Sequence, residues 1–468
     1  MKKLSLIIVT LLFTVTGALA QNFRTGYFLD GYMFKYQLNP AFQGERGFIA
    51  LPTLGGTSLG VESNMSFGTF VYPQGEQLVS FLHPSVSSTD FMSQIKTNNP
   101  LNLNLDMNLL AFGFRVKNTY HTLDLSLKGG MNTVLPGDMF RFMKVGGEDG
   151  NTNYDFSHMS TNLTVYSQLA YGFSIKIKDF MSVGVRAKFL MGLQTIQSNI
   201  ETFKLSLQPD KWSLNAGGYF MTSPIATDLI TDNLDGDWAT VLKGITKSPG
   251  YGAAFDLGIS VDFLKHFTVS ASVLDLGFIN WKGINKLNVA TGSWEYGGFD
   301  DINSSDDTDV ESQLQMELEE LAEIFKFEEA KLVDKHLQKF GFTTMLGLEF
   351  RMPFYKRLTI GALGTHRFEG SASWTEGRFS LNLAPLRWLS LSANYAISTY
   401  GDSYGAALNI HPKGFNLFLG LDSFKPFLKM TPQFIPVEDM NLNLKFGVTF
   451  PFGKYNGRYP KVDKTAKN

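Results

Sequence analysis

Apolar and polar residues alternate one by one over long stretches of this chain. The clearest stretch is 441–452, whose apolar positions are Leu442, Leu444, Phe446, Val448, Phe450 and Phe452. Successive side chains of a β-strand point to opposite faces, so this pattern predicts a strand with one apolar and one polar face. In a soluble sandwich the apolar face would meet a second sheet, whereas in a membrane barrel it would meet lipid.

The same alternation recurs along the chain. From residue 101, polar residues alternate with Leu and Met until the adjacent pair Leu109-Leu110 shifts the phase, which predicts a β-bulge. Further runs cover residues 122–128, 183–193, 267–273, 346–352, 379–383, 389–397 and 415–421. Because several runs are longer than the strands of a soluble sandwich, they favour the tilted strands of a transmembrane antiparallel β-barrel.

The connections between these runs predict the topology. Six are tight and each carries a basic residue: 117–118, 178–179, 265–266, 353–356, 385–387 and 411–413. Longer joints alternate with them, at about residues 73–100, 135–157, 209–249, 283–338, 369–372, 400–402 and 424–439. Outer-membrane barrels place short turns in the periplasm and longer loops outside, so residues 47–453 are predicted to form about 14 strands (roughly 12–16). The first strand is expected over residues 47–54 and, after the turn Gly55-Gly56, from residue 57 towards 72. The run 441–452 is expected to be the last strand and to close against the first near residues 57–71.

The N-terminus predicts export. Lys2 and Lys3 precede an apolar run, and Ala18-Leu19-Ala20 has the form of a cleavage site, which together indicate a signal peptide over residues 1–20. The chain has no Cys, so we expect neither a lipid attachment nor a disulfide. With the strand pattern, export predicts location in the outer membrane of a Gram-negative cell.

Residues 21–46 do not alternate. They hold many aromatic residues and the tripeptide Asn39-Pro40-Ala41. So many aromatic side chains are rarely left in water, so we expect an N-terminal arm folded against or inside the barrel, with a loose periplasmic tail as the alternative. At the other end, residues 454–468 are predicted to form a basic periplasmic tail.

Charge and motifs exclude several functions. The formal net charge of −2 argues against nucleic acid as a partner. The seven His residues are scattered, and no catalytic or phosphate-binding motif is present. We therefore expect no enzyme activity, no cofactor and no metal centre.

An acidic outer loop is predicted at about residues 300–339, which hold 13 Asp and Glu residues against 4 Lys. Apolar residues at helical spacing predict a helix from Val310 to about Gln338 within it. A cation site is the sharper alternative to a solvated acidic helix. The EF-hand template fails, however, because Asp306 stands where it needs Gly and Ser312 where it needs Glu.

If the apolar positions face lipid, the alternate positions put charges of both signs in the lumen. The candidates are Asp106, Arg115, Asp124, Lys128, Arg186, Lys188, Glu349 and Arg351. A barrel must satisfy its interior polar groups internally, so we expect these side chains to cross-link a polar interior.

Two short motifs carry a family resemblance: 38–42 in the arm and 274–281 at a strand end. They resemble motifs of an uncharacterised family of Bacteroidota outer-membrane barrels, similar in layout to FadL-like transporters and to PorV-type barrels of the type IX secretion system. The resemblance implies a luminal hatch formed by the arm. The matching positions are Asn39, Pro40 and Ala41 in the hatch motif and Asp275, Gly277 and Trp281 in the strand-end motif.

Two functions are compatible with this fold. The first is a channel or transporter for small molecules, hydrophobic ones included. The second is a non-transporting structural or docking barrel for a secretion, surface-attachment or envelope-assembly partner. The expected partners are outer-membrane lipid together with a small-molecule solute or an envelope or secretion protein.

Overall fold

The computed structural model describes residues 23–51, 55–75, 77–146, 153–208, 212–223, 250–296, 331–370, 373–424 and 439–456. The predicted signal peptide, most of the acidic loop and most of the C-terminal tail lie outside these residues. No helix in the described ranges is long and apolar enough to cross a membrane.

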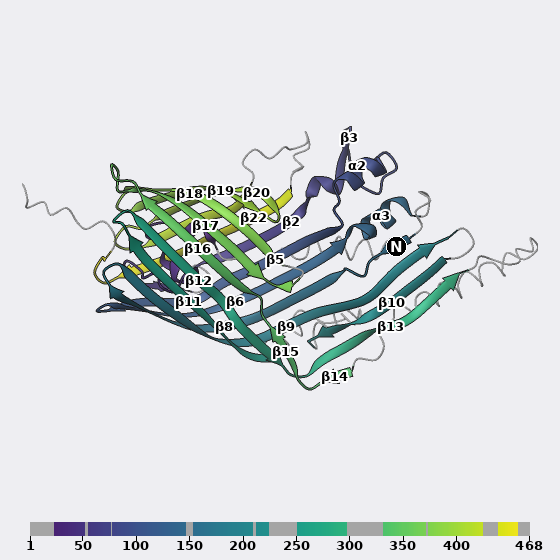
Figure 1. The fold of residues 1–468 in the computed structure, drawn as a ribbon, viewed down its shortest axis with the longest axis horizontal. Helices are drawn as coiled ribbons and strands as arrows, with labels where there is room; N and C mark the ends of the chain where they lie inside the picture. Colours follow the sequence, from purple (N-terminus) through teal and green to yellow (C-terminus); the bar gives the residue numbers. More distant parts are fainter. Residues whose placement is uncertain are drawn as a thin grey trace, which may run out of the picture.

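The body of the molecule is a closed antiparallel barrel of 14 strands, as predicted (Figure 1). In chain order the strands are β1 (Gly47–Ala50) continued by β2 (Thr57–Ser66), β5 (Asn98–Val116), β6 (Thr119–Pro136), β8 (Ser160–Lys178), β9 (Met181–Leu207), β11 (Gly250–Phe263), β12 (Phe267–Trp281), β15 (His336–Lys339) continued by β16 (Phe342–Arg351), β17 (Leu358–Phe368), β18 (Trp374–Leu386), β19 (Leu389–Ser398), β20 (Gly401–Ile410), β21 (Asn416–Phe424) and β22 (Asp439–Phe452).

The last strand closes the barrel against the first, as the alternation in 441–452 led us to expect. β22 pairs with β1 from Gly47↔Phe452 and then with β2 from Thr57↔Phe446. The predicted bulge is also present, because the β5–β6 pairing shifts between Asn108 and Leu110.

The first strand is shorter than expected in both of its parts. The run expected from residue 57 towards 72 ends at Ser66, where Ser66 and Thr69 each accept a hydrogen bond from the other's backbone N–H. The run expected over 47–54 ends at Ala50, just before Pro52, a residue that cannot donate a ladder hydrogen bond. Among the described residues, pairing with β22 therefore passes from Ala50↔Thr449 to Thr57↔Phe446.

The wall differs in height around the barrel. β5, β6, β8 and β9 have 19, 18, 19 and 27 residues, whereas β16, β19, β20 and β21 have 10, 10, 10 and 9. A tilted membrane strand needs about 9–11 residues, so the short wall is enough to span and the tall wall projects beyond it. Figure 1 shows this projection, continued by β10 (Trp212–Thr222), β13 (Ile284–Tyr296), β14 (Lys331–Val333) and β7 (Asn153–Asp155).

The prediction of an acidic helix is wrong at its C-terminal end. Residues 331–333 and 336–339 form β14 and β15, which pair with β13 and β12. These pairings cover strand edges that would otherwise be open, which outweighs local helical spacing. The remainder of the predicted helix, up to residue 330, lies outside the described residues.

Small elements cover part of the barrel end that lies opposite the six tight turns. They are η3 (Phe67–Thr69), the hairpin of β3 (Val71–Gln74) and β4 (Gln77–Ser80), α2 (Ser88–Ser93) and α3 (Gly137–Val145). They pack around the buried ring of Phe91 and the half-buried ring of Phe70.

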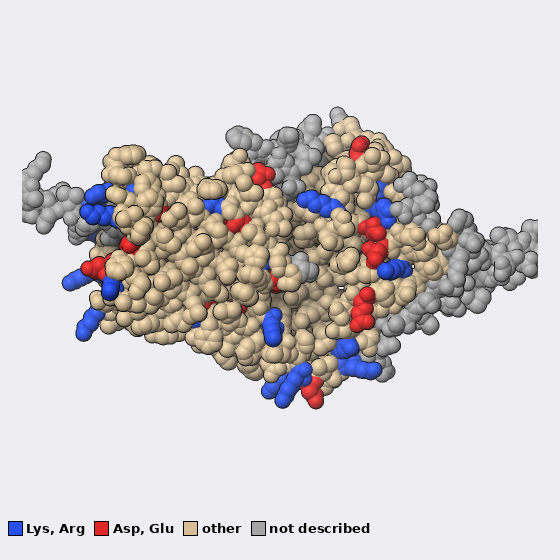
Figure 2. Space-filling model, viewed as in Figure 1, with Lys and Arg blue, Asp and Glu red and all other residues tan. Residues whose placement is uncertain are grey.

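The two barrel faces have opposite character. On β6 and β8, Leu123 and Tyr171 are exposed outward while Asp124 and Ser126 are buried inward. Figure 2 shows the outer side of the barrel largely free of charged side chains between its two ends. The six predicted tight turns lie at one end, with Gly47 and Phe452, and we call this the turn end; the opposite end is the rim end.

Candidate functional site: the luminal arm and its cavities

Residues 23–46, which we call the arm, lie inside the barrel. The arm forms two short 3-10 helices, η1 (Arg24–Gly26) and η2 (Met33–Gln37). Phe23 and Phe34 are at most 1% exposed and pack in one core with the wall residues Phe48 and Phe418. Within the described chain, β-ladder pairing starts only at Gly47, so side chains and not a ladder hold the arm in place.

The start of the arm is held by five buried charged side chains, which we call the clamp: Arg24, Glu62, Glu376, Arg378 and Asp422. Arg24 Nη2 lies 2.9 Å from Glu62 Oε1 and 3.4 Å from Glu376 Oε2, and Arg24 Nε lies 3.2 Å from Asp422 Oδ2. Asp422 also accepts the backbone N–H of Arg24 at 3.0 Å and of Thr25 at 2.5 Å. A buried charge is tolerated only when it is paired in this way.

A second buried network lies in the wall and is called the wall cluster: Asp124, Arg186, Lys188, Asp256 and Asp275. Arg186 lies 2.6 Å from Asp124 and 3.1 Å from Asp256. Lys188 Nζ lies 2.5 Å from both Asp256 Oδ1 and Asp275 Oδ1. The network joins β6, β9, β11 and β12, and the arm reaches it through Tyr36, whose ring lies 5.3 Å from the Arg186 guanidinium.

Asp275 has an unusual backbone. Its φ is 65°, in the left-handed region, beside the register shift between Phe255 and Leu257 in the β11–β12 pair. Its N–H donates to Asp256 Oδ1 at 2.8 Å, and its side chain lines a luminal cavity. Left-handed backbone outside glycine is uncommon and gathers at functional positions, so this residue is a candidate for a role beyond packing.

The arm motif seats the end of the arm on the wall. Asn39 Nδ2 donates to the carbonyls of Ile259 at 3.2 Å and Ala271 at 3.1 Å, while its Oδ1 accepts the N–H of Ala41 at 2.9 Å. A Cβ added to Gly184 would lie 2.1 Å from the Pro40 carbonyl oxygen. The position of the tripeptide therefore depends on the side-chain amide of Asn39 and on the close approach of the Pro40 carbonyl to the backbone of Gly184.

The strand-end motif packs β12 against its neighbouring strands β11 and β15. Trp281 is fully buried and its Nε1 donates to Gln338 Oε1 at 2.7 Å. A Cβ on Gly277 would lie 2.4 Å from the Cβ of Ala254. Of the three motif residues, Asp275 faces the lumen while Gly277 and Trp281 hold β11, β12 and β15 together.

The other luminal candidates lie at different heights. Lys128 pairs with Asp106 at 3.1 Å, and Arg115 donates to Gln43 at 2.5 Å at the end of the arm. Glu349 is buried. Arg351 lies at the end of β16, where its backbone N–H donates a hydrogen bond to the carbonyl of His266 at 2.8 Å.

None of the five clamp residues was among the luminal residues predicted from the sequence. Glu62, Glu376, Arg378 and Asp422 occupy inward positions of their strands, so the alternation could have shown them as luminal. Nothing in the sequence shows that they meet Arg24.

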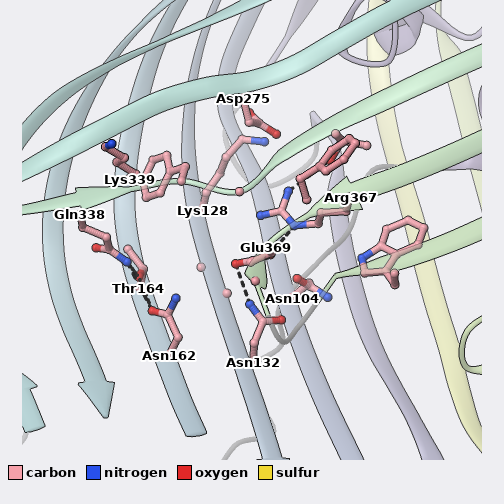
Figure 3. Close-up of a pocket in the computed structure, with 18 of the residues that line it drawn as sticks. Asn104, Lys128, Asn132, Asn162, Thr164, Asp275, Gln338, Lys339, Arg367 and Glu369 are labelled. Atoms are coloured by element: carbon pink, nitrogen blue, oxygen red, sulfur yellow. Dashed lines mark hydrogen bonds and ion pairs between the residues drawn. The ribbon is translucent and has the colours of Figure 1, made fainter. Parts of the chain in front are cut away.

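Two cavities lie on either side of the arm. The rim cavity, about 380 Å³, is lined by Lys128, Asp275, Arg367, Glu369 and neighbouring amide side chains, as Figure 3 shows. Arg24 contributes to its lining, with its guanidinium 4.7 Å from the ring of Trp374.

The turn-side cavity, about 440 Å³, is lined by Asp30 and Lys35 of the arm and by Arg115, Lys117 and Glu349 of the wall. Both cavities are therefore charged and polar, and the aromatic arm separates them. Among the described residues, no group of three or more His, Cys, Asp or Glu side chains could hold a metal ion.

Solved structures give low-identity matches. The toluene transporter TbuX of Ralstonia pickettii is 9% identical with a TM-score of 0.43, over 90% of this chain and 94% of that one. A Pseudomonas aeruginosa FadL homologue is 10% identical with a TM-score of 0.44, over 93% and 100%. The toluene transporter TodX of P. putida is 8% identical with a TM-score of 0.40, over 90% and 92%.

No curated protein matches the sequence. A family model does match, over residues 40–422, which include most of the barrel and the Pro40-Ala41 end of the arm motif. The chain therefore belongs to the family of unknown function DUF5723.

Proposed function

We propose that this protein is an outer-membrane channel for small polar solutes, and that the arm closes it in the conformation described above. The observation that carries the proposal is the position of the arm between two polar luminal cavities. In the proposed orientation the short turns face the periplasm and the tall wall projects outward.

The way the arm is held supports a movable plug. A segment built into the β-ladder could leave only by breaking consecutive backbone hydrogen bonds. The arm is fixed instead by side-chain contacts: the clamp, Asn39, the Asn409 and Asn416 amides that donate to its carbonyls, and the packing of its apolar side chains in the lumen. Such sites can be released one at a time by a solute, a partner or a change in charge.

The cavity linings support polar solutes over hydrophobic ones. In the rim cavity, Gln338 Nε2 donates to Thr164 at 2.8 Å and Asn132 Nδ2 donates to Glu369 at 2.9 Å, so amide and charged groups dominate its walls (Figure 3). A hydrophobic solute would have to strip water from these groups without replacing their hydrogen bonds, which is unfavourable.

The test is solute flux into liposomes, with the protein as purified and with residues 23–46 deleted. We expect slow swelling with the full chain and rapid swelling without the arm for sugars and amino acids. A shift in the selected solutes from polar to hydrophobic would contradict the proposed solute class.

A disulfide tether gives a matched control, because the chain has no Cys of its own. A Cβ on Gly405 would lie 2.6 Å from Thr25 Oγ1, so Thr25→Cys with Gly405→Cys can join the arm to β20. Any flux seen with the reduced protein should stop on oxidation and return with a reductant. If deletion of the arm leaves every solute excluded while the barrel stays folded, the channel proposal is wrong.

The second candidate is a docking barrel that does not transport. The specific observation in its favour is the continuous aromatic core of the arm, which fills the lumen between the cavities. The projecting strands β9, β10 and β13 would then present the partner surface. Exclusion of all solutes by the arm-deleted barrel would favour this candidate. The absence of enzyme activity stays a prediction.

A further inference from the structure

The turn end carries a ring of basic side chains. Its exposed Lys and Arg residues in and beside the connections are Lys117, Lys176, Lys178, Lys265, Lys356, Arg387, Lys413 and Lys454. Among the described residues at this end, the exposed acidic side chains are Asp179 and Asp262. Figure 2 shows these charges gathered at the left end of the molecule.

The rim end carries exposed side chains of both charge signs. Its exposed described basic residues are Lys96, Lys204, Lys282, Lys331, Lys335 and Lys339, and its exposed described acidic residues are Asp90, Glu201, Asp334 and Asp402. Mixed charges create little net field, whereas one dominant sign attracts the opposite charge. The turn end is therefore the strongly charged surface of the described barrel.

Aromatic side chains lie between the basic ones. Phe354 is 81% exposed, Phe263 56%, Phe180 48% and Trp388 45%. Aromatic rings favour the boundary between headgroups and acyl chains, and long basic side chains reach from there to the headgroup phosphates. The turn tips thus combine the two side-chain types that a charged lipid interface selects.

Two of these lysines occupy unfavourable backbone positions. Lys117 has a φ of 52° and Lys265 a φ of 59°. Tight hairpin turns with positive φ favour Asn or Gly, which adopt this conformation at low cost. Leu264 beside Lys265 also has a positive φ, of 48°, so these turns accept residues other than Gly, and Asn at positions 117 and 265 would remove the charge while keeping the turn.

We propose that this ring binds the phosphate headgroups of anionic phospholipids, of the phosphatidylglycerol class, in the leaflet that the turn end faces. The negative phosphodiester pairs with the lysine ammonium groups while the neighbouring rings enter the boundary below it. The proposal concerns the turn end, where Lys117 also lines the turn-side cavity, and it does not depend on whether the lumen conducts.

The test compares two fourfold variants of the full-length protein in nanodiscs with equal phosphatidylglycerol and phosphatidylethanolamine. The turn variant is Lys117→Asn, Lys178→Gln, Lys265→Asn and Lys413→Gln. The matched rim variant is Lys96→Gln, Lys204→Gln, Lys282→Gln and Lys335→Gln. Native mass spectrometry of the released protein counts the retained lipids of each class.

We expect the wild type and the rim variant to retain phosphatidylglycerol preferentially. The turn variant should lose that preference, by up to about fivefold for each removed lysine near the headgroups. An unchanged lipid ratio in the turn variant, or an equal loss in the rim variant, would overturn the proposal.

A loss of the lipid preference can be distinguished from a folding defect. Asn suits the left-handed backbone at positions 117 and 265, so the single variants Lys117→Asn and Lys265→Asn should fold at least as well as the wild type. They should each show part of the loss. If these variants keep the wild-type lipid ratio but weaken the binding of an acidic protein, the ring serves a protein partner and the lipid proposal is wrong.

Discussion

The clamp and the wall cluster are built from the same chemistry but join different parts of the molecule. Each contains three carboxylates and two basic groups, nearly all of them buried. In the wall cluster every member belongs to a barrel strand. In the clamp, Arg24 belongs to the arm while its three carboxylate partners belong to β2, β18 and β21.

This difference determines what each cluster can do. Strands β6, β9, β11 and β12 stay together through their ladders whether or not their charges are paired. The arm has no such ladder, and it is held by the clamp together with the packing of its buried apolar side chains. A buried ion pair adds little net stability, but removing one partner costs about 3–5 kcal/mol because the other charge is stranded.

The largest expected effect is on the arm, from Arg24→Met. The substitution leaves Glu376 and Asp422 with Arg378 and removes the ion pair between Arg24 and Glu62. We expect the seated state of the arm to lose about 3–5 kcal/mol, which raises the fraction of unseated arm and with it the conductance in planar bilayers.

Arg24→Lys is the matched control for this variant. It keeps the charge but loses the planar fork that contacts several carboxylates, so its conductance should fall between those of the wild type and Arg24→Met. A folded Arg24→Met barrel that stays as closed as the wild type would show that the clamp does not hold the arm.

Arg186→Met tests the wall cluster in the same way. It removes the ion-pair partner of Asp124 in the wall, while Asp256 keeps Lys188, so the free energy of unfolding should fall by about 3–5 kcal/mol in a urea titration. The arm would lose only the cation–π contact of Tyr36, about 1 kcal/mol, so conductance should stay near the wild-type level. Equal opening by the two arginine variants would remove the distinction between the clusters.

The third expected effect depends on pH and acts where the arm passes the turn end. His411, in the β20–β21 turn, has its pKa lowered to about 4 by burial, with Asp30 raising it and Lys35 lowering it. A Cβ on Gly31 of the arm would lie 2.7 Å from the His411 ring, and Ser390 lies within hydrogen-bond distance of its Nε2 at 3.0 Å.

The sign follows from the two protonation states. With the arm unseated, the ring should regain an ordinary pKa near 6.5, so the unseated state binds more protons between pH 6.5 and about 4. Seating is therefore fully stable above pH 6.5 and weakens as the pH falls to about 4, by up to about 3 kcal/mol. Conductance should rise over this window in the wild type and stay flat in His411→Asn.

Much of the barrel could be predicted because a period of two is a local signal. The bulge at Leu109-Leu110 and the closing role of 441–452 were both readable from neighbouring residues. A break in the first strand was predicted at Gly55-Gly56, but the end of β1 at Ala50 and the strands at 331–339 were not predicted, because each depends on what the segment meets in space.

The site was less predictable than the fold for the same reason. Alternation places Asp124, Arg186 and Lys188 in the lumen, but the partners are chosen by the closed barrel. Arg24 and Asp422 are 398 residues apart, and only the folded arm brings them together. The arm motif was noticed through resemblance, while its physical role on β11 and β12 required coordinates.

The smallest expected effect comes from the arm's uncharged anchor, Asn39. Its amide donates to two wall carbonyls, so Asn39→Ala should weaken seating by about 1–3 kcal/mol, less than the loss of a clamp charge. Asn39→Asp would place a carboxylate oxygen against the carbonyls of Ile259 and Ala271 and should weaken seating further. If either variant opens the barrel more than Arg24→Met does in the same bilayer assay, the hydrogen-bonded end of the arm is its principal attachment and the clamp is secondary.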